Sequence, residues 1–318
     1  RPKRKKPFAT PPFERGVRRL RTVFFGSSAF AVPSLTAAAR EHDVVAVYTQ
    51  ADKPAGRGLR LTPTPVKVAA QTAGLPVFTP EKLDPQFSAS VAARNPDVLI
   101  AASYGKILPR DLLSVPALAA LNIHPSLLPA YRGATPIQAA LRDGLTTTGV
   151  TIIWMSPQMD AGDIALAERV SIAPDDDFQT LHDRLAQIGA ELLVRALSEL
   201  ARGSLARVPQ DPSAATYTRP ITKEETRLRL DDAPSAANLV RALSPRPAAW
   251  LELGGRRIKV LRARAEDVKQ PTGAPGSVLS LEGDGPLIAC AAGALRLLRV
   301  VPEGKPPMSG AEFARSLR

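Results

Sequence analysis

Two polar side chains, Asn122 and His124, stand two residues apart at the end of the short apolar segment ALNIH. Side chains two apart on a strand lie side by side on one face. An amide donor beside an imidazole can polarise a carbonyl group and transfer a proton. The residues that follow, PSLLPAYRGATP, predict a stiff polar loop suited to a flat ligand. For an Asn-x-His pair taken alone, capping of a strand end is the preferred interpretation.

Two acidic residues follow the next apolar segment, GVTIIWMS, in the turn PQMDAGDIA. If the ends of neighbouring strands converge, Asp160 can reach His124. A carboxylate there would orient the imidazole and favour its protonated form. Asp163 is better interpreted as a turn-forming residue.

A long basic connection, QADKPAGRGLRLTPTPVK, covers residues 50–67. It is too long for a routine connection between a strand and a helix, and we expect a flexible loop. Such a loop could grip a phosphate backbone, or it could be an ordinary solvated surface. The loop has a single acid, Asp52, among its bases, and this excess of positive charge favours binding of a phosphate backbone. The bases are Lys53, Arg57, Arg60 and Lys67.

A second basic segment, RRIKVLRAR, reads as a strand near the C-terminus. Simple alternation places Arg257 and Lys259 on one face, and Arg262 and Arg264 on the other. A basic rim suits contact with an RNA backbone. Charged edge residues that prevent aggregation are the alternative explanation.

The elements that must position these residues alternate along the chain from Thr22 onward. Continuous apolar strands separated by helices predict a mainly parallel sheet covered on both faces, which is a doubly wound α/β domain. Ligands of such sheets bind beyond the carboxyl ends of the strands. The segment FFGSSAF after the first strand is not GxGxxG, so no dinucleotide site is expected. The predicted strands cover 22–25, 43–49, 77–78, 97–102, 120–124 and 149–154, and the helices 31–40, 65–73, 87–94, 111–113 and 136–142.

The rest of the chain predicts a second, smaller domain. Apolar residues at helical spacing predict a long helix that ends near Gly203. Residues 204–220 hold several prolines and no periodicity, which predicts a linker. A helix over 236–243 and five short strands, over 249–253, 256–263, 276–281, 287–290 and 295–301, then predict a small OB-like β-barrel. We therefore expect a catalytic domain over 22–203 and a barrel domain over 221–318.

The amino-acid composition excludes several classes of protein. One cysteine and three histidines exclude a disulfide framework and most cysteine-rich metal sites, and no apolar run reaches the length of about 18 residues that a membrane span needs. The net charge of +12 suggests a polyanionic partner, although an Arg-rich proteome would have the same effect. Residues 1–21 are strongly basic and predict a disordered tail. The tail fits an RNA-binding arm, an organellar leader or an extension without a role.

Several segments together resemble the methionyl-tRNA formyltransferase family over almost all of residues 22–318. They are VFFGSSAFAVPSL, TQADKPAGRGLRLTPTPVK, SYGKILP, LNIHPSLLPAYRGATPIQAAL, GVTIIWMSPQMDAGDI, YTRPITKEE and PEGKPPMSG. Pro125 departs from the Gly that bacterial members often have. The basic tail has no counterpart in the family, and the chain could end short of the usual terminus.

The resemblance implies transfer of a formyl group from 10-formyltetrahydrofolate, a consumed co-substrate, to the α-amine of methionyl-initiator tRNA, without a metal. It implies a monomer in the bacterial cytoplasm, with an organelle left open by the tail. The implied catalytic residues are Asn122, His124 and Asp160. The implied folate-binding residues are Ser126, Leu127, Leu128 and Pro129. The implied tRNA-binding residues are Lys53, Arg57, Arg60, Lys67, Arg257 and Lys259.

Two other functions remain open at this point. A folate-dependent formyltransferase acting on an amino sugar or a ribonucleotide would share the Asn, His and Asp, but would lack the PAGRG loop. A non-catalytic RNA-binding protein on the same scaffold would not need the three residues together.

Overall fold

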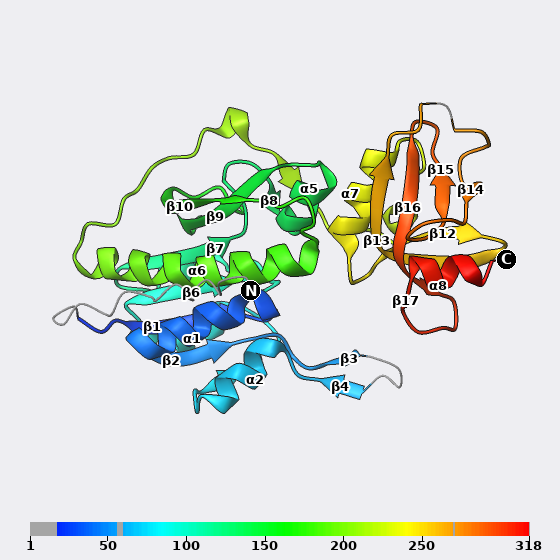
Figure 1. The fold of residues 1–318 in the computed structure, drawn as a ribbon. Helices are drawn as coiled ribbons and strands as arrows, with labels where there is room; N and C mark the ends of the chain where they lie inside the picture. Colours follow the sequence, from blue (N-terminus) through cyan, green and yellow to red (C-terminus); the bar gives the residue numbers. More distant parts are fainter. Residues whose placement is uncertain (1–17, 56–59, 270, 318) are drawn as a thin grey trace, which may run out of the picture. The chain divides into compact units, whose positions relative to one another are not determined.

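The computed structural model describes residues 18–55, 60–269 and 271–317 (Figure 1). Most of the basic tail and Arg57 of the basic loop therefore lie outside the described residues. The chain divides into two compact units. The first joins residues 1–129, 150–168 and 185–213, and the second joins residues 130–149, 169–184 and 214–318.

A seven-stranded sheet is built in the order β10-β9-β7-β6-β1-β2-β5. The pairs of β1 with β2 and β6, of β2 with β5, and of β6 with β7 are parallel, whereas β7 and β9 are antiparallel. The expected mainly parallel sheet is thus confirmed. Its strands are β1 (Arg21–Gly26), β2 (Asp43–Tyr48), β5 (Val77–Phe78), β6 (Val98–Ala102), β7 (Ala119–His124), β9 (Thr147–Trp154) and β10 (Ile164–Ser171).

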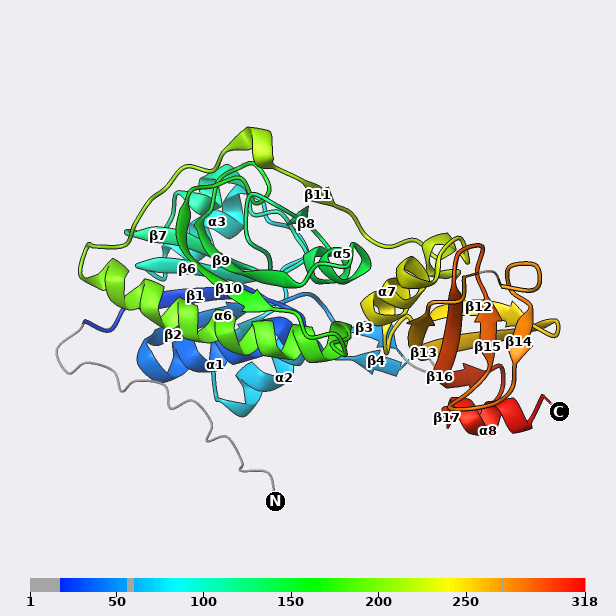
Figure 2. The same ribbon diagram turned by 45° about the horizontal axis from the view of Figure 1, so that its top comes forward.

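Helices cover both faces of this sheet (Figure 2). On one face, α3 and α4 pack through Val91 and Leu112 on Phe25 and Leu99. On the other face, α6 lies directly on β7, because a Cβ at Gly189 would be 3.0 Å from the Ile123 side chain. The helices are α1 (Val32–Glu41), α2 (Pro65–Thr72), α3 (Pro85–Ala92), α4 (Arg110–Leu113), α5 (Pro136–Arg142) and α6 (Phe178–Ala201).

Local sequence signals set several of these boundaries. Thr64 caps α2 by accepting a hydrogen bond from the Lys67 backbone N–H, and Asp84 caps α3 in the same way. Each of these helices has a proline in its first turn, where no intrahelical donor is lost. The strands β1 and β2 are mostly buried, and all five residues of β6 are buried.

Some elements differ from the sequence expectation. The basic loop contains an antiparallel hairpin of β3 (Lys53–Ala55) and β4 (Arg60–Thr62). The strand β10 was not expected, because its alternating burial is interrupted by charged residues. The predicted linker contains η2 (Pro212–Ala214) and β11 (Tyr217–Thr218), and β11 pairs with β8 (Arg132–Gly133).

The C-terminal part carries an antiparallel, barrel-like sheet in the order β12-β13-β16-β15-β14, with β17 paired to β16. Two glycines, Gly254 and Gly255, join β12 and β13 with positive φ angles of 57° and 71°, as a tight hairpin needs. The strands are β12 (Ala249–Leu253), β13 (Arg256–Glu266), β14 (Val278–Ser280), β15 (Leu287–Ala289), β16 (Ala294–Pro302) and β17 (Met308–Ser309). The helical elements are η3 (Glu224–Thr226), α7 (Ala233–Leu243) and α8 (Gly310–Arg315).

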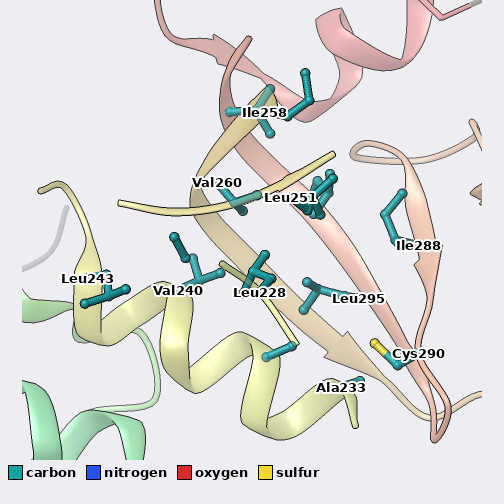
Figure 3. Close-up of a cluster of buried hydrophobic side chains, with 14 of the residues drawn as sticks. Leu228, Ala233, Val240, Leu243, Leu251, Ile258, Val260, Ile288, Cys290 and Leu295 are labelled. Atoms are coloured by element: carbon teal, nitrogen blue, oxygen red, sulfur yellow. The ribbon is translucent and has the colours of Figure 1, made fainter. Parts of the chain in front are cut away.

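One face of α7 closes the core of this sheet (Figure 3). Val240 and Leu243 of α7 pack in one buried cluster with Leu251, Val260 and Leu295 of the strands. The only cysteine of the sequence, Cys290, lies in this cluster, and burial raises the pKa of its thiol to about 11.

A β-bulge in β13 overturns one sequence expectation. The pairing with β16 shifts register between Val260 and Arg262. After the shift, Ala263 and Ala265 pack against the same core as Val260. Arg262 and Arg264 are therefore exposed on the same face as Arg257 and Lys259, and not on the opposite face.

Candidate active site

The carboxyl end of β7 carries the two polar residues singled out in the sequence. Asn122 lies opposite Ala101 of β6 and Ile153 of β9, and His124 lies opposite Thr151 of β9. Asn122 is partly buried, and His124 is only 4% exposed. Two neighbouring strands thus fix the backbone on which both side chains stand.

Asp160 completes a three-residue cluster with them. The Asn122 amide Nδ2 donates to Asp160 Oδ1 at 3.4 Å, and His124 Nδ1 lies 3.6 Å from Asp160 Oδ2. The side chains of His124 and Asp160 are 5% and 13% exposed, so water screens this contact only weakly. One carboxylate can therefore orient both an amide donor and an imidazole.

Asp160 reaches the cluster by a different route from the one expected. Because β9 runs antiparallel to β7, the end of β9 continues toward the start of β7, and the Met155 N–H donates to Ala120 O at 2.7 Å. The segment after Trp154 must then fold back. Asp160 lies in that returning turn with a φ of +53°, a left-handed conformation that Asp adopts more readily than most residues.

The loop after β7 is held by one buried hydroxyl that sequence reasoning did not single out. Thr151 Oγ1 donates to Ser126 O at 2.7 Å and accepts from the Leu128 N–H at 3.2 Å. Thr151 is fully buried in a strand of apolar neighbours, and this isolated polar residue was the available signal. Ser126 and Leu128 are buried, while Leu127 and Pro129 are partly exposed and can face a ligand.

The ends of β1, β2 and β6 are tied together near this edge. Ser27 Oγ donates to Tyr104 O at 3.0 Å, and Gln50 Nε2 donates to the same carbonyl at 2.8 Å. Gly26 is required by packing, because a Cβ there would lie 2.9 Å from the Ala31 Cβ. Burial, with a smaller effect of Tyr48, raises the pKa of Tyr104 to about 12, which keeps its phenol protonated.

The described bases of the basic loop differ in their surroundings. Lys53 Nζ donates to Gln50 Oε1 at 2.6 Å. Lys67 Nζ lies 2.8 and 2.9 Å from the two carboxylate oxygens of Asp52. Arg60 stands on the exposed strand β4. The charge of Lys67 is therefore largely balanced within the protein.

On the barrel-like sheet, the bases surround a tryptophan. The Arg257 guanidinium lies 3.9 Å from the centre of the Trp250 ring, and Lys259 is the register partner of Trp250. Arg227 lies over the same ring at 5.4 Å. This exposed surface presents cations beside an aromatic ring, a combination typical of single-stranded nucleic-acid binding.

Two absences concern only the described part of the chain. No group of three or more His, Cys, Asp or Glu side chains in it is arranged to hold a metal ion. Among its helices, none is long and apolar enough to cross a membrane.

Two family models match this chain. The model "Formyl transferase" matches residues 20–197, and "Formyl transferase, C-terminal domain" matches residues 220–318. A protein of Methylobacterium sp. (strain 4-46) named methionyl-tRNA formyltransferase is 46% identical over 308 residues, which cover 94% of this chain and 97% of that protein. A protein of the same name from Geobacter metallireducens is 39% identical and covers 94% of this chain and 96% of its own length.

Solved structures with the same fold are more distant in sequence. An N-formyltransferase from Helicobacter canadensis, in complex with folinic acid and dTDP-3-aminofucose, has a TM-score of 0.67 at 15% identity, covering 87% of this chain and 99% of that one. HypX from Aquifex aeolicus, in complex with tetrahydrofolic acid, has a TM-score of 0.63 at 19% identity, covering 93% of this chain and 47% of that one. At these identities the likeness concerns the fold.

Proposed function

The chain belongs to the methionyl-tRNA formyltransferase family, and from that premise we propose that it transfers the formyl group of 10-formyltetrahydrofolate to the α-amine of methionyl-initiator tRNA. The observation that carries the proposal is the cluster at the sheet edge. Asp160 lies 3.4 Å from the Asn122 amide and 3.6 Å from the His124 imidazole.

We assign each of the three residues a role in the transfer. As the neutral amine attacks the formyl carbon, negative charge develops on the formyl oxygen. Asn122, and His124 when it is protonated, stabilise this oxyanion by donating hydrogen bonds. The proton lost by the amine passes through a base or water to the nitrogen of the departing folate. Asp160 orients His124 for that transfer.

The two substrates are assigned to different surfaces. The loop of Ser126, Leu127, Leu128 and Pro129 takes the folate, and Thr151 fixes its backbone. The basic hairpin and the barrel-like sheet take the tRNA backbone, through Lys53, Arg57, Arg60, Lys67, Arg257 and Lys259. We further propose a catalytic domain over 22–203, a linker over 204–220 and a tRNA-binding domain over 221–318, in a monomer of the bacterial cytoplasm.

An acceptor panel tests this function. The purified protein is mixed with 10-formyltetrahydrofolate and methionyl-initiator tRNA, free methionine or an amino-sugar nucleotide. Formyl-methionine released by hydrolysis of the tRNA, with no product from the other acceptors, is expected. Asp160→Asn should abolish the product while tRNA affinity stays close to that of the unchanged protein. Asp183→Asn is the matched control, because the Asp183 carboxylate also contacts an imidazole, that of His182 at 2.8 Å. Product only from the sugar, or full turnover by Asp160→Asn, would contradict the assignment.

A further inference from the structure

Residues 206–210, which we name the strap, run beside the turn that carries Asp160. Val208 and Ile164 exchange two backbone hydrogen bonds of 3.0 and 2.7 Å. The Trp154 indole N–H donates to Ala206 O at 2.8 Å. Arg207 Nε donates to Asp163 Oδ2 at 2.8 Å. The strap is therefore fastened to the end of β9 and to the start of β10, on both sides of the turn.

The last residue of the strap contacts the turn itself. Gln210 Nε2 donates to Asp160 O at 2.9 Å and to Gly162 O at 2.7 Å. One primary amide carries two N–H groups, so a single side chain holds both carbonyls. Gln210 is partly buried, so these bonds are shielded from full competition with water.

The turn has a conformation that needs such support. Asp160 has a φ of +53°, in the region that non-glycine residues rarely adopt. Gly162 is pressed against β9, since a Cβ there would lie 1.7 Å from Trp154 O. The Trp154 N–H donates to Asp163 O at 2.9 Å and fixes the far end of the turn. Gln210 thus holds the carbonyl of Asp160 from the strap.

We propose that Gln210 is a positioning residue for Asp160. By holding the carbonyls of Asp160 and Gly162, it fixes the backbone from which the carboxylate reaches Asn122 and His124. The proposal rests on the catalytic role proposed for Asp160. Loss of Gln210 releases the turn, and Asp160 no longer holds the imidazole in one orientation.

The chemistry of the contact requires this residue type. Two carbonyl oxygens need two donors on one short planar group, which an amide supplies. Gln210→Glu would place carboxylate oxygens against the carbonyls and repel them. Gln210→Asn keeps the amide but shortens the side chain by one methylene, so it can reach the turn only in part.

The test compares Gln210→Ala, Gln210→Glu and Gln210→Asn with Gln179→Ala in the full-length chain. Gln179 is the matched control, because its Nε2 also donates twice, to the two oxygens of Asp183 on the exposed face of α6. We expect kcat of Gln210→Ala to fall by tens of times, up to about 10²-fold, as misplacement of a catalytic group does. The KM values of both substrates should stay within about threefold, because binding contacts are kept. Gln210→Asn should recover part of kcat, and Gln210→Glu none.

A second measurement does not depend on activity. The sequence has three histidines, so the side-chain ¹H–¹⁵N signals of His42, His124 and His182 can be assigned by substitution. The His124 signals should move in Gln210→Ala while those of His42 and His182 stay in place. In Gln179→Ala the His124 signals should stay in place, and only those of His182 can move, because Asp183 contacts both Gln179 and His182.

Three results would overturn the proposal. They are an unchanged kcat in Gln210→Ala, unmoved His124 signals, or a shift of all three histidines together with loss of the unfolding transition. If the unchanged protein formylates no acceptor, the proposed function fails, but the His124 signals still decide whether Gln210 positions Asp160.

Discussion

Thr151→Val should destabilise the first unit more than Thr151→Ser does, although valine keeps the volume of threonine. The Thr151 hydroxyl is fully buried and bonds both Ser126 O and the Leu128 N–H. Leaving a buried polar group without a partner costs about 1–3 kcal/mol, so two such groups predict a loss of about 2–6 kcal/mol. Serine keeps the hydroxyl and loses one methyl group, which costs about 1 kcal/mol. Valine should also raise the KM for 10-formyltetrahydrofolate, because the loop loses its backbone support.

Urea unfolding followed by tryptophan fluorescence can measure this difference. The sequence has two tryptophans, Trp154 on β9 and Trp250 on β12. In a Trp250→Phe background the fluorescence reports Trp154 alone, three residues from the substitution. A serine variant as unstable as the valine variant, or less stable, would refute the argument that these hydrogen bonds outweigh packing at Thr151.

Two further predictions concern charge. Arg57→Ala should raise the KM for tRNA and reduce the salt slope of binding by about 1, whereas Lys67→Ala should change both less, because Asp52 already balances Lys67. Filter binding at several salt concentrations checks this, and equal effects would contradict it. The paired Arg296 and Arg264 lower the pKa of Glu266 to about 2, from an ordinary value of 4.5. This depressed pKa stabilises the fold above pH 4.5, and that stability is lost as the pH falls toward 2. Unfolding measured against pH should therefore depend less on pH in Glu266→Gln, and an unchanged profile would show that the pair adds nothing.

Elements with strong local signals could be predicted closely from the sequence. The predicted bounds of α5, β5 and β12 agree with those in the structure. Helix α5 begins at Pro136, and β12 ends at the Gly254–Gly255 turn, so local chemistry marks both boundaries. The mainly parallel sheet could also be predicted, because its strands are continuous apolar runs. Such runs are typical of strands that are buried on both faces, as in a parallel sheet covered by helices.

Features that depend on distant partners could not be predicted. The β-bulge at Val260–Arg262 is a shift in the register with which β13 pairs with β16. Simple alternation of side chains along β13 does not contain that shift, so it assigned Arg262 and Arg264 to the wrong face. The sequence of the strap shows no hydrophobic periodicity from which its place could be predicted. Its hydrogen bonds to Asp160, Gly162 and Ile164 join residues more than forty positions apart in the chain, so no local pattern marks them. A segment of this kind reads as a linker until its partners are known.

The approach of Asp160 to His124 shows why the strap matters. In a parallel pair, the two carboxyl ends would meet at one edge, and a short turn would be enough. Because β9 is antiparallel to β7, its end points away from His124, and the chain must return before Asp160 reaches the imidazole. The strands alone therefore do not bring Asp160 to His124, and the turn after β9 must do so. The turn places Asp160 in a left-handed conformation, and Gln210 holds its carbonyl. If Gln210 has the role we propose, the accuracy of the proposed active site depends on a segment outside the sheet.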